Sequence, residues 1–223
     1  ALILVRIMSH VEYGVLSVLL GIMYVLANIL DFGIHANIYS VLPVLVDESR
    51  EKTLSFLKSN LFYQSSLSLI VIIFLIMFFP QLDNVFFKTN ESRLVLNITA
   101  ISTIFMVWQN SILNILYAAK KFIKANLYLN LSNLIKTIVL FGLIYFNAIN
   151  GGSVIFVFAI LGPFAFFAFL FLYSRNTAKE LIFSKVDKKY FKLKYTIPYF
   201  VGTQFFNLGL RMDLFMLSFF GLG

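Results

Sequence analysis

Six long apolar runs follow one another along the chain, and they constrain its fold more than any other feature of the sequence. They lie near residues 13–31, 59–79, 94–119, 125–146, 154–173 and 196–222. A helix needs about 20 consecutive apolar residues to cross a bilayer. Closed β-barrels, the other fold that spans membranes, show short segments of alternating polarity instead. The runs therefore predict an all-α, polytopic bundle of transmembrane helices.

Composition supports a membrane protein and excludes several kinds of site. Of the 223 residues, 60% are hydrophobic and 13% are charged, whereas soluble domains average about 25% charged residues. Because the chain has no cysteine, disulfides, thiolate metal ligands and a cysteine nucleophile are excluded. It also has no glycine-rich phosphate loop, no H-E-x-x-H and no G-x-S-x-G motif. We therefore expect no enzyme activity, no cofactor and no bound metal.

Both ends of the sequence resemble interrupted helices. Residues 1–8 (ALILVRIM) are apolar, but they are too short to span a bilayer and lack the basic start of a signal peptide. We interpret them as the tail of helix one, so that the six runs become helices two to seven. The last run ends with the chain, and we expect the sequence to be the N-terminal fragment of a longer protein.

Lysine and arginine are distributed unevenly between the loops. The loops after helices two, four and six, at residues 50–58, 120–124 and 175–194, hold 13 of them, whereas the loops after helices three and five hold two, Lys88 and Arg93. Cytoplasmic loops carry the excess of basic residues. The N-terminus and the basic loops are therefore predicted to be cytoplasmic, and residues 83–93 external. The net charge of +8 thus reflects topology, and we expect no nucleic-acid partner.

The segment at residues 176–194 (NTAKELIFSKVDKKYFKLK) mixes basic with apolar residues. Such a mixture is typical of an amphipathic helix on the inner leaflet. A solvated basic linker explains the composition equally well, and both interpretations remain open.

Polar residues inside four predicted helices recur at helical spacing, so that each set lies on one face. The sets are Tyr24, Asn28, Asp31 and His35; Asn110, Asn114 and Tyr117; Asn126, Asn130, Asn133 and Thr137; and Gln204, Asn207 and Arg211. Amide side chains can hold membrane helices together by packing alone. A polar cavity explains better why four sets and several charges occur together, because charges in hydrocarbon are unfavourable. The almost purely apolar parts of helices three and six, at 69–79 and 154–173, are predicted to face lipid.

Three cationic residues lie within predicted helices: Arg6, Lys136 and Arg211. Lysine and arginine bind phosphate well, so a cavity that they line would favour an anionic ligand. Arg6 and Arg211 could instead extend to a membrane interface, which leaves Lys136 as the strongest candidate. The candidate substrate-binding set is completed by neutral hydrogen-bonding residues, Asn133, Asn207 and Gln204.

Two carboxylates, Asp31 and Asp213, are candidates for ion coupling. An ionised carboxylate at the centre of a membrane helix is unfavourable by about 2.5–3.5 kcal/mol, which indicates a role beyond packing. For Asp31 there is an alternative: it caps a helix that is broken at Gly33, because a short polar side chain satisfies freed backbone N–H groups.

The order and spacing of four short motifs resemble one transporter family. Arg6–Gly14 (RIMSHVEYG) is similar to the end of its helix one, and residues 31–34 (DFGI) are similar to the D-hydrophobic-G motif late in its helix two. Residues 108–124 resemble its helix four and the basic turn that follows. Residues 196–223, with Ile197-Pro198 and Arg211-Met212-Asp213, resemble the start of its helix seven. The family is the O-antigen and polysaccharide (Wzx-type) branch of the multidrug/oligosaccharidyl-lipid/polysaccharide flippases.

The resemblance implies two six-helix lobes around a central cavity, in the cytoplasmic (inner) membrane of the cell. Residues 1–174 would be the N-terminal lobe with a truncated helix one, 175–195 a cytoplasmic linker, and 196–223 helix seven at the start of the C-terminal lobe. The implied function is export of a lipid-linked oligosaccharide by alternating access, coupled to a proton or sodium gradient.

The resemblance also implies roles for particular residues. Arg6, Lys136 and Arg211 would bind the pyrophosphate of the lipid-linked glycan. The family often has glycine where Ser9 stands and arginine near Ser40. Helix two is therefore not expected to supply a cation.

Other functions stay open. A drug or cation antiporter of the same superfamily would favour carboxylates such as Asp31 and Asp213 in its cavity. A non-transporting membrane subunit of a polysaccharide-synthesis complex would lack the second lobe. A membrane glycosyltransferase is disfavoured, because residues 80–93 hold only Asp83 and Glu91 as carboxylates.

Overall fold

The computed structural model describes residues 2–89, 91–190 and 193–210, and within these ranges the chain forms helices and no strand. The elements are α1 (Leu2–Ile7), α2 (His10–Ile29), α3 (Ile34–Glu48), α4 (Arg50–Leu82), the π-helix η1 (Asp83–Phe87), α5 (Arg93–Ala118), α6 (Phe122–Tyr145), α7 (Gly151–Phe156), the π-helix η2 (Val157–Leu161), α8 (Gly162–Phe183), the short 3₁₀-helix η3 (Lys188–Tyr190) and α9 (Leu193–Leu210). The predicted all-α class is confirmed.

Five helical stretches in the described part are long and apolar enough to cross a membrane. They are α2, α4 with η1, α5, α6, and the continuous run of α7, η2 and α8. These stretches coincide with five of the six apolar runs, so the prediction of a multi-pass membrane bundle is confirmed. The sixth run, 196–222, lies partly outside the described residues.

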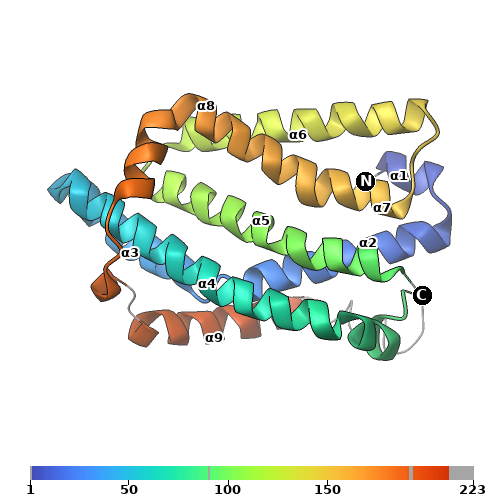
Figure 1. Cartoon of the computed structure of the whole chain (residues 1–223), viewed down its shortest axis with the longest axis horizontal. Coiled ribbons are helices and arrows are strands. Elements are labelled where there is room, and N and C mark those ends of the chain that lie inside the picture. The colour runs from blue at the N-terminus through green and yellow to red at the C-terminus, as the bar shows by residue number, and fades with distance from the viewer. Residues whose placement is uncertain (1, 90, 191–192, 211–223) are drawn as a thin grey trace.

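The long helices run side by side, and α5 occupies the centre of the bundle (Figure 1). It contacts α2, α3, α4, α6, α7 and α8. Small hydroxyl residues make this close packing possible: Thr99, Ser102 and Thr103 are buried and donate hydrogen bonds to carbonyls of their own helix. Small residues let membrane helices approach one another closely.

Two helices, α2 and α3, follow one another with a break between them, and both pack against α5 (Figure 1). The sequence predicted only the first of them. Helix α3 has 15 residues and contains Pro43, so it is shorter than a membrane span and carries a residue that disfavours helix interiors. It is stabilised by packing, since Ile34, Ile38 and Leu42 are buried against α4 and α5.

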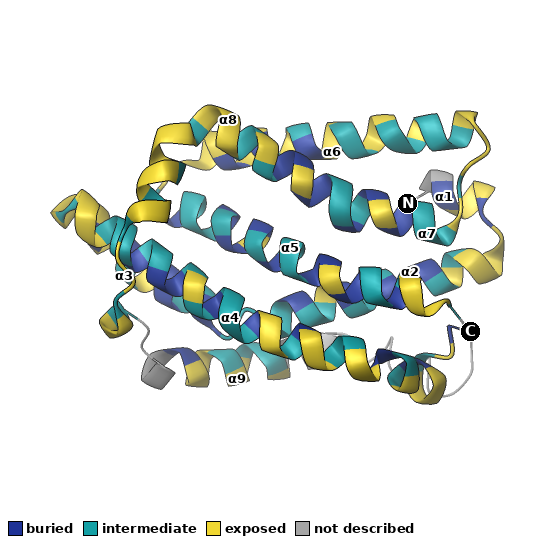
Figure 2. Cartoon of the chain, in the orientation of Figure 1, coloured by how far each residue is buried: buried dark blue, intermediate teal, exposed yellow. Residues whose placement is uncertain are grey.

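The prediction that helix six faces lipid is wrong. In its most apolar part, 44% of the residues are buried in the bundle, whereas the corresponding figure for α4 is 17%. The residues from Val154 to Phe166 pack against α2, α5 and α6. Figure 2 shows the same contrast between the mostly buried and intermediate residues from α7 to the start of α8 and the many exposed residues on the far half of α4. Apolar composition could not decide this, because lipid tails and a protein interior are equally apolar.

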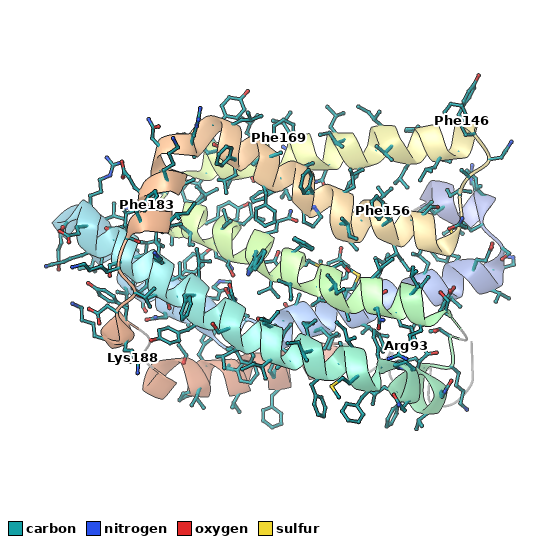
Figure 3. All side chains as sticks on the ribbon, viewed as in Figure 1. Arg93, Phe146, Phe156, Phe169, Phe183 and Lys188 are labelled. Carbon is teal, nitrogen blue, oxygen red and sulfur yellow. The ribbon has the colours of Figure 1, made fainter. Side chains whose placement is uncertain are left out.

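The basic loops gather at one end of the bundle. Figure 3 shows Phe183 and Lys188 at that end, and Arg93 and Phe146 at the other. An ion pair joins two of the loops there, because the Arg50 guanidinium lies 2.7 Å from a carboxylate oxygen of Glu180. The loops that are rich in lysine and arginine therefore lie at one end of the bundle, and the loops with few basic residues lie at the other.

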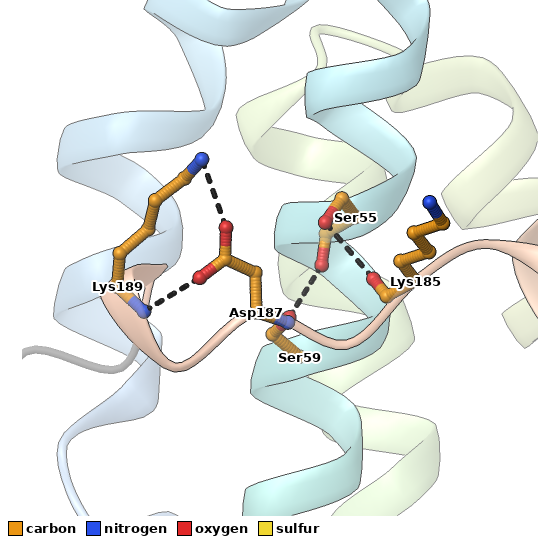
Figure 4. Close-up of polar contacts among 5 residues, drawn as sticks. All are labelled: Ser55, Ser59, Lys185, Asp187 and Lys189. Carbon is orange, nitrogen blue, oxygen red and sulfur yellow. Dashed lines mark hydrogen bonds and ion pairs between the residues drawn. The ribbon is translucent and has the colours of Figure 1, made fainter.

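The segment after α8, at residues 184–187, packs against α4. The Ser55 hydroxyl donates to the carbonyl of Lys185 (2.9 Å), and the backbone N–H of Asp187 donates to the Ser59 hydroxyl oxygen (2.8 Å). Figure 4 shows these contacts together with the Asp187–Lys189 ion pair. Side chains on α4 thus hold the backbone of the segment in place.

Tyr190 continues this attachment toward α9. Its carbonyl accepts a hydrogen bond from the Asn37 amide (2.9 Å), and its ring packs edge-on against Phe56 at 5.7 Å. Asn37 also donates to Asn60 (2.8 Å), so the contact is anchored in the interior. The attachment delivers the chain to α9, which packs against α3.

Candidate functional site

The backbone is irregular at the break between α2 and α3. Phe32 and Gly33 adopt left-handed φ angles of 49° and 73°. The N–H of Phe32 donates to Ile29 (3.3 Å), and that of Ile34 donates to Asp31 (3.0 Å). In an unbroken helix these N–H groups would bond to the carbonyls of residues 28 and 30. The break therefore frees two carbonyls from helical hydrogen bonding.

Other helices supply donors to both freed carbonyls. Gln204 of α9 donates its side-chain N–H to the Asn28 carbonyl at 3.1 Å. The Ser68 hydroxyl of α4 donates to the Leu30 carbonyl at 3.4 Å. Buried backbone groups need such partners, because no water is present in the hydrocarbon. The break is thus integrated with α4 and α9.

Asp31 lies at the break itself. Its carboxylate accepts a hydrogen bond from the backbone N–H of His35 at 3.4 Å. Asp31 thus satisfies a free N–H group of α3 from two residues before the N-cap residue, Gly33, which is close to one of the two roles that the sequence suggested. No described lysine or arginine forms an ion pair with Asp31. The coupling role stays a prediction.

Gly33 is required at the break for two reasons. Its left-handed φ is a conformation that glycine adopts without a Cβ penalty. In addition, a Cβ at this position would overlap the backbone carbonyl oxygen of Thr196, which shows how closely α9 approaches. The rings of Phe32 and Phe200, 6.2 Å apart, extend the same contact.

A cavity of about 360 Å³ opens at the break. Its lining comes from α2, α3, α4, α5 and α9 and is mainly polar and aromatic. It includes Asn28, Asp31, His35, Gln64, Asn110, Asn114, Tyr117, Tyr199, Phe200, Thr203 and Gln204. The volume lies within the range of about 300–1,000 Å³ that is typical of ligand pockets.

The polar faces predicted on helices two and four meet in this cavity. His35 Nδ1 and the Asn114 side-chain nitrogen lie 3.1 Å apart, which joins α3 to α5. Gln204 brings the face of helix seven to the same place. Asn207 has no described side chain, and Arg211 and Asp213 lie outside the described residues.

The polar face of helix five lies elsewhere. Asn126, Asn130, Asn133 and Thr137 are exposed on α6 and do not line the cavity. One hydrogen bond connects the two regions, from the Tyr117 hydroxyl to the Asn126 side-chain oxygen at 3.1 Å. Asn133 is therefore not brought together with Gln204.

The cations expected at the site are not gathered there. Arg6 is exposed on α1. Lys136 packs its methylene groups against Gly162, and its ammonium lies 5.7 Å from the centre of the Phe158 ring. No lysine or arginine is among the described residues that line the cavity, and Asp31 is the one carboxylate among them. The charge of the described cavity is thus opposite to the expected one.

Gln64 is a lining residue that the sequence analysis did not single out. It is 1% exposed, and its side-chain oxygen accepts a hydrogen bond from Ser111 at 2.6 Å, while its side-chain nitrogen has no partner among the described residues. A signal was available, because Asn60, Gln64 and Ser68 recur every four residues on one face of α4. An amide nitrogen without a partner at a cavity is available to a ligand oxygen.

No group of three or more metal-ligating side chains occurs within the described residues. Comparison with known protein families, with curated proteins and with solved structures gave no match.

Proposed function

We propose that this chain belongs to a membrane transporter of the polysaccharide flippase type, which exports a lipid-linked oligosaccharide by alternating access. The observation that supports the proposal best is the break between α2 and α3, whose freed backbone and polar side chains open onto a cavity inside the bundle. Irregular backbone at membrane depth is tolerated where it is buried in protein or lines a cavity. Discontinuous helices of this kind form the binding sites of many transporters.

The cavity lining favours the glycan part of such a substrate. Asn28, Asn110 and Gln64 offer amide donors and acceptors, and Tyr199 and Phe200 add aromatic surface. Hydroxyl groups both donate and accept hydrogen bonds, so they match this lining better than a purely anionic group does. Binding of the pyrophosphate by Arg6, Lys136 and Arg211 rests on the family resemblance alone.

The test of the proposal is lipid flipping by the full-length protein in vesicles with a defined lipid-linked oligosaccharide. Gln64→Leu removes the unpartnered amide and should lower flipping about ten-fold, because a lost hydrogen bond is worth about 1.4 kcal/mol. Asn130→Leu, on the exposed face of α6, is the matched control and should leave flipping unchanged. Equal flipping by the Gln64 variant and the wild type would contradict the proposal.

The membrane and orientation form part of the same proposal: the cytoplasmic membrane, with the basic end of the bundle inside. Residues 1–223 contain no cysteine, so a single cysteine introduced there is the one thiol in this part of the chain. Val85 is exposed near the end of α4 and Lys121 is exposed between α5 and α6. An impermeant thiol reagent added outside whole cells should label Val85→Cys and not Lys121→Cys. The reverse pattern would overturn the orientation.

A cation antiporter is the second candidate, and it is favoured by one specific observation. Asp31 is the single carboxylate in the described lining, which contains no described lysine or arginine. A carboxylate inside a membrane bundle attracts a cation. Proton-coupled efflux of a cationic dye from vesicles, without any lipid-linked glycan, would favour this candidate. Inactivity in both assays would favour the remaining hypothesis, a non-transporting membrane subunit of a polysaccharide-synthesis complex.

A further inference from the structure

The last turns of α8 follow a kink at Ser174 and carry basic residues, unlike the apolar first part of the helix. Ser174 has non-helical dihedral angles (φ −132°, ψ 27°) within the helix. Beyond it, Arg175, Lys179, Ile182 and Phe183 are exposed and lie at positions i, i+4, i+7 and i+8. This spacing places them on one face of the helix. We call these four residues the α8 basic stripe.

Contacts with α4 fix the direction in which the stripe faces. Glu180, which lies off the stripe, is paired with Arg50 at 2.7 Å. The Lys58 ammonium donates to the carbonyls of Ile182 and Ser184 at the end of the helix, where a cation also interacts favourably with the helix dipole. The segment cannot rotate about its axis without breaking these contacts. The stripe is therefore held away from the bundle.

The charge of this region is strongly positive. Both acidic residues between positions 175 and 190 are already paired, Glu180 with Arg50 and Asp187 with Lys189 (2.8 Å). Hydrogen bonds from Lys189 hold the pKa of the Asp187 carboxyl below its ordinary value. Within the described residues Arg175 and Lys179 have no ion-pair partner, and the same holds for Lys185 and Lys188.

Large apolar side chains stand beside these free cations. Phe183 is 85% exposed and Ile182 is 63% exposed. The opposite end of the bundle offers a contrast, because Phe146 is 75% exposed there and no basic residue occurs between positions 137 and 174. At the α8 end, by contrast, the exposed apolar residues Ile182 and Phe183 share one helix face with Arg175 and Lys179.

We propose that the α8 basic stripe binds anionic phospholipid at the membrane surface. Arg175 and Lys179 would contact the headgroup phosphates, while Ile182 and Phe183 enter the boundary of the acyl chains. Amphipathic helices with basic and aromatic residues lie in this zone, and long basic side chains reach headgroups from there. An acidic protein partner would match the charge of Arg175 and Lys179, but it would not explain why Ile182 and Phe183 are exposed beside them.

Site-directed fluorescence quenching tests the proposal. Phe183→Cys is introduced into the full-length protein, in which any cysteine outside residues 1–223 is replaced by serine. The variant is labelled with an environment-sensitive dye and reconstituted in mixed phosphatidylcholine and phosphatidylglycerol vesicles. Brominated acyl chains are placed on one lipid at a time, at equal mole fraction. We expect phosphatidylglycerol to quench more strongly. Each basic residue contributes about 1 kcal/mol of attraction, roughly a five-fold preference, so Arg175→Gln with Lys179→Gln should abolish most of the excess.

Two controls make the result specific. Lys52→Gln removes a cation at the same end that is already paired with Glu48, and it should keep the excess. A dye at Phe146→Cys, at the opposite end, should be quenched equally by both lipids. Equal quenching at position 183, or quenching there by aqueous iodide and by neither lipid, would overturn the proposal. An excess that survives the double substitution would overturn it as well.

Discussion

Gln204 of α9 donates a hydrogen bond to the backbone carbonyl of Asn28 across the break between α2 and α3, at 3.1 Å. That carbonyl lacks its helical partner, because the N–H of Phe32 turns to Ile29 instead. A residue proposed from the sequence as a substrate ligand therefore also supports the backbone of another helix. Helix α9 and the break act as one unit at the cavity.

Gln204→Leu should destabilise the protein, because the partly buried Asn28 carbonyl then loses its donor. We expect the free energy of unfolding to fall by about 1 kcal/mol, within the range measured for hydrogen bonds between membrane helices. Titration of unfolding with denaturant in detergent would measure the change. Asn130→Leu on the exposed face of α6 is the matched control. A change no larger than that of the control would mean that the bond contributes nothing.

Gly33→Ala should have a larger effect than Gln204→Leu. The new Cβ meets the carbonyl oxygen of Thr196 and also disfavours the left-handed φ of 73°. The left-handed conformation alone costs roughly 1–2 kcal/mol for a residue with a Cβ. Gly21→Ala is the comparison, since nothing lies within 4 Å of its added Cβ. Inside α2 it should be neutral or stabilising by up to about 1 kcal/mol. Thermal unfolding of both variants in the same detergent distinguishes the two positions, and equal midpoints would contradict the close approach of α9.

Asp31→Asn separates capping from ion coupling. Asparagine caps a helix about as well as aspartate, so the contact with the His35 N–H predicts little change in stability. A role in coupling predicts that flipping no longer responds to an imposed proton or sodium gradient. We expect unfolding to be unchanged and the response to the gradient to be lost. Measuring flipping with and without the gradient decides the matter, and an intact response would leave the cap as the sole role.

Lys136→Ala should reduce export while the protein remains inserted, because it leaves a space beside Gly162 and removes the charge near Phe158. Lys136→Met distinguishes the two effects, since methionine fills the space without a charge. Lys136 does not line the described cavity, and we therefore expect Met to restore most of the export. Export that stays low with Met and recovers with Arg would instead assign the charge to substrate binding.

The sequence by itself determined the number and boundaries of most membrane helices, because apolar length and loop composition are local properties. Helices α5 and α6 begin and end within a few residues of the predicted runs at 94–119 and 125–146. The shared faces of Asn28 with Asp31, and of Asn110 with Asn114, also followed from helical periodicity alone, and both face the cavity.

Only the tertiary structure decided which face meets which neighbour. Lys136 and Asn133 are three residues apart on α6, yet Lys136 packs on Gly162 while Asn133 is exposed. Contacts between residues far apart in sequence bury Val154 and Ile155 of α7 and place Gln64 at the cavity. In a membrane the hydrophobic effect does not distinguish lipid from protein interior. Which residues are buried therefore depends on how side chains of different helices pack together. The sequence of one helix alone does not contain this information.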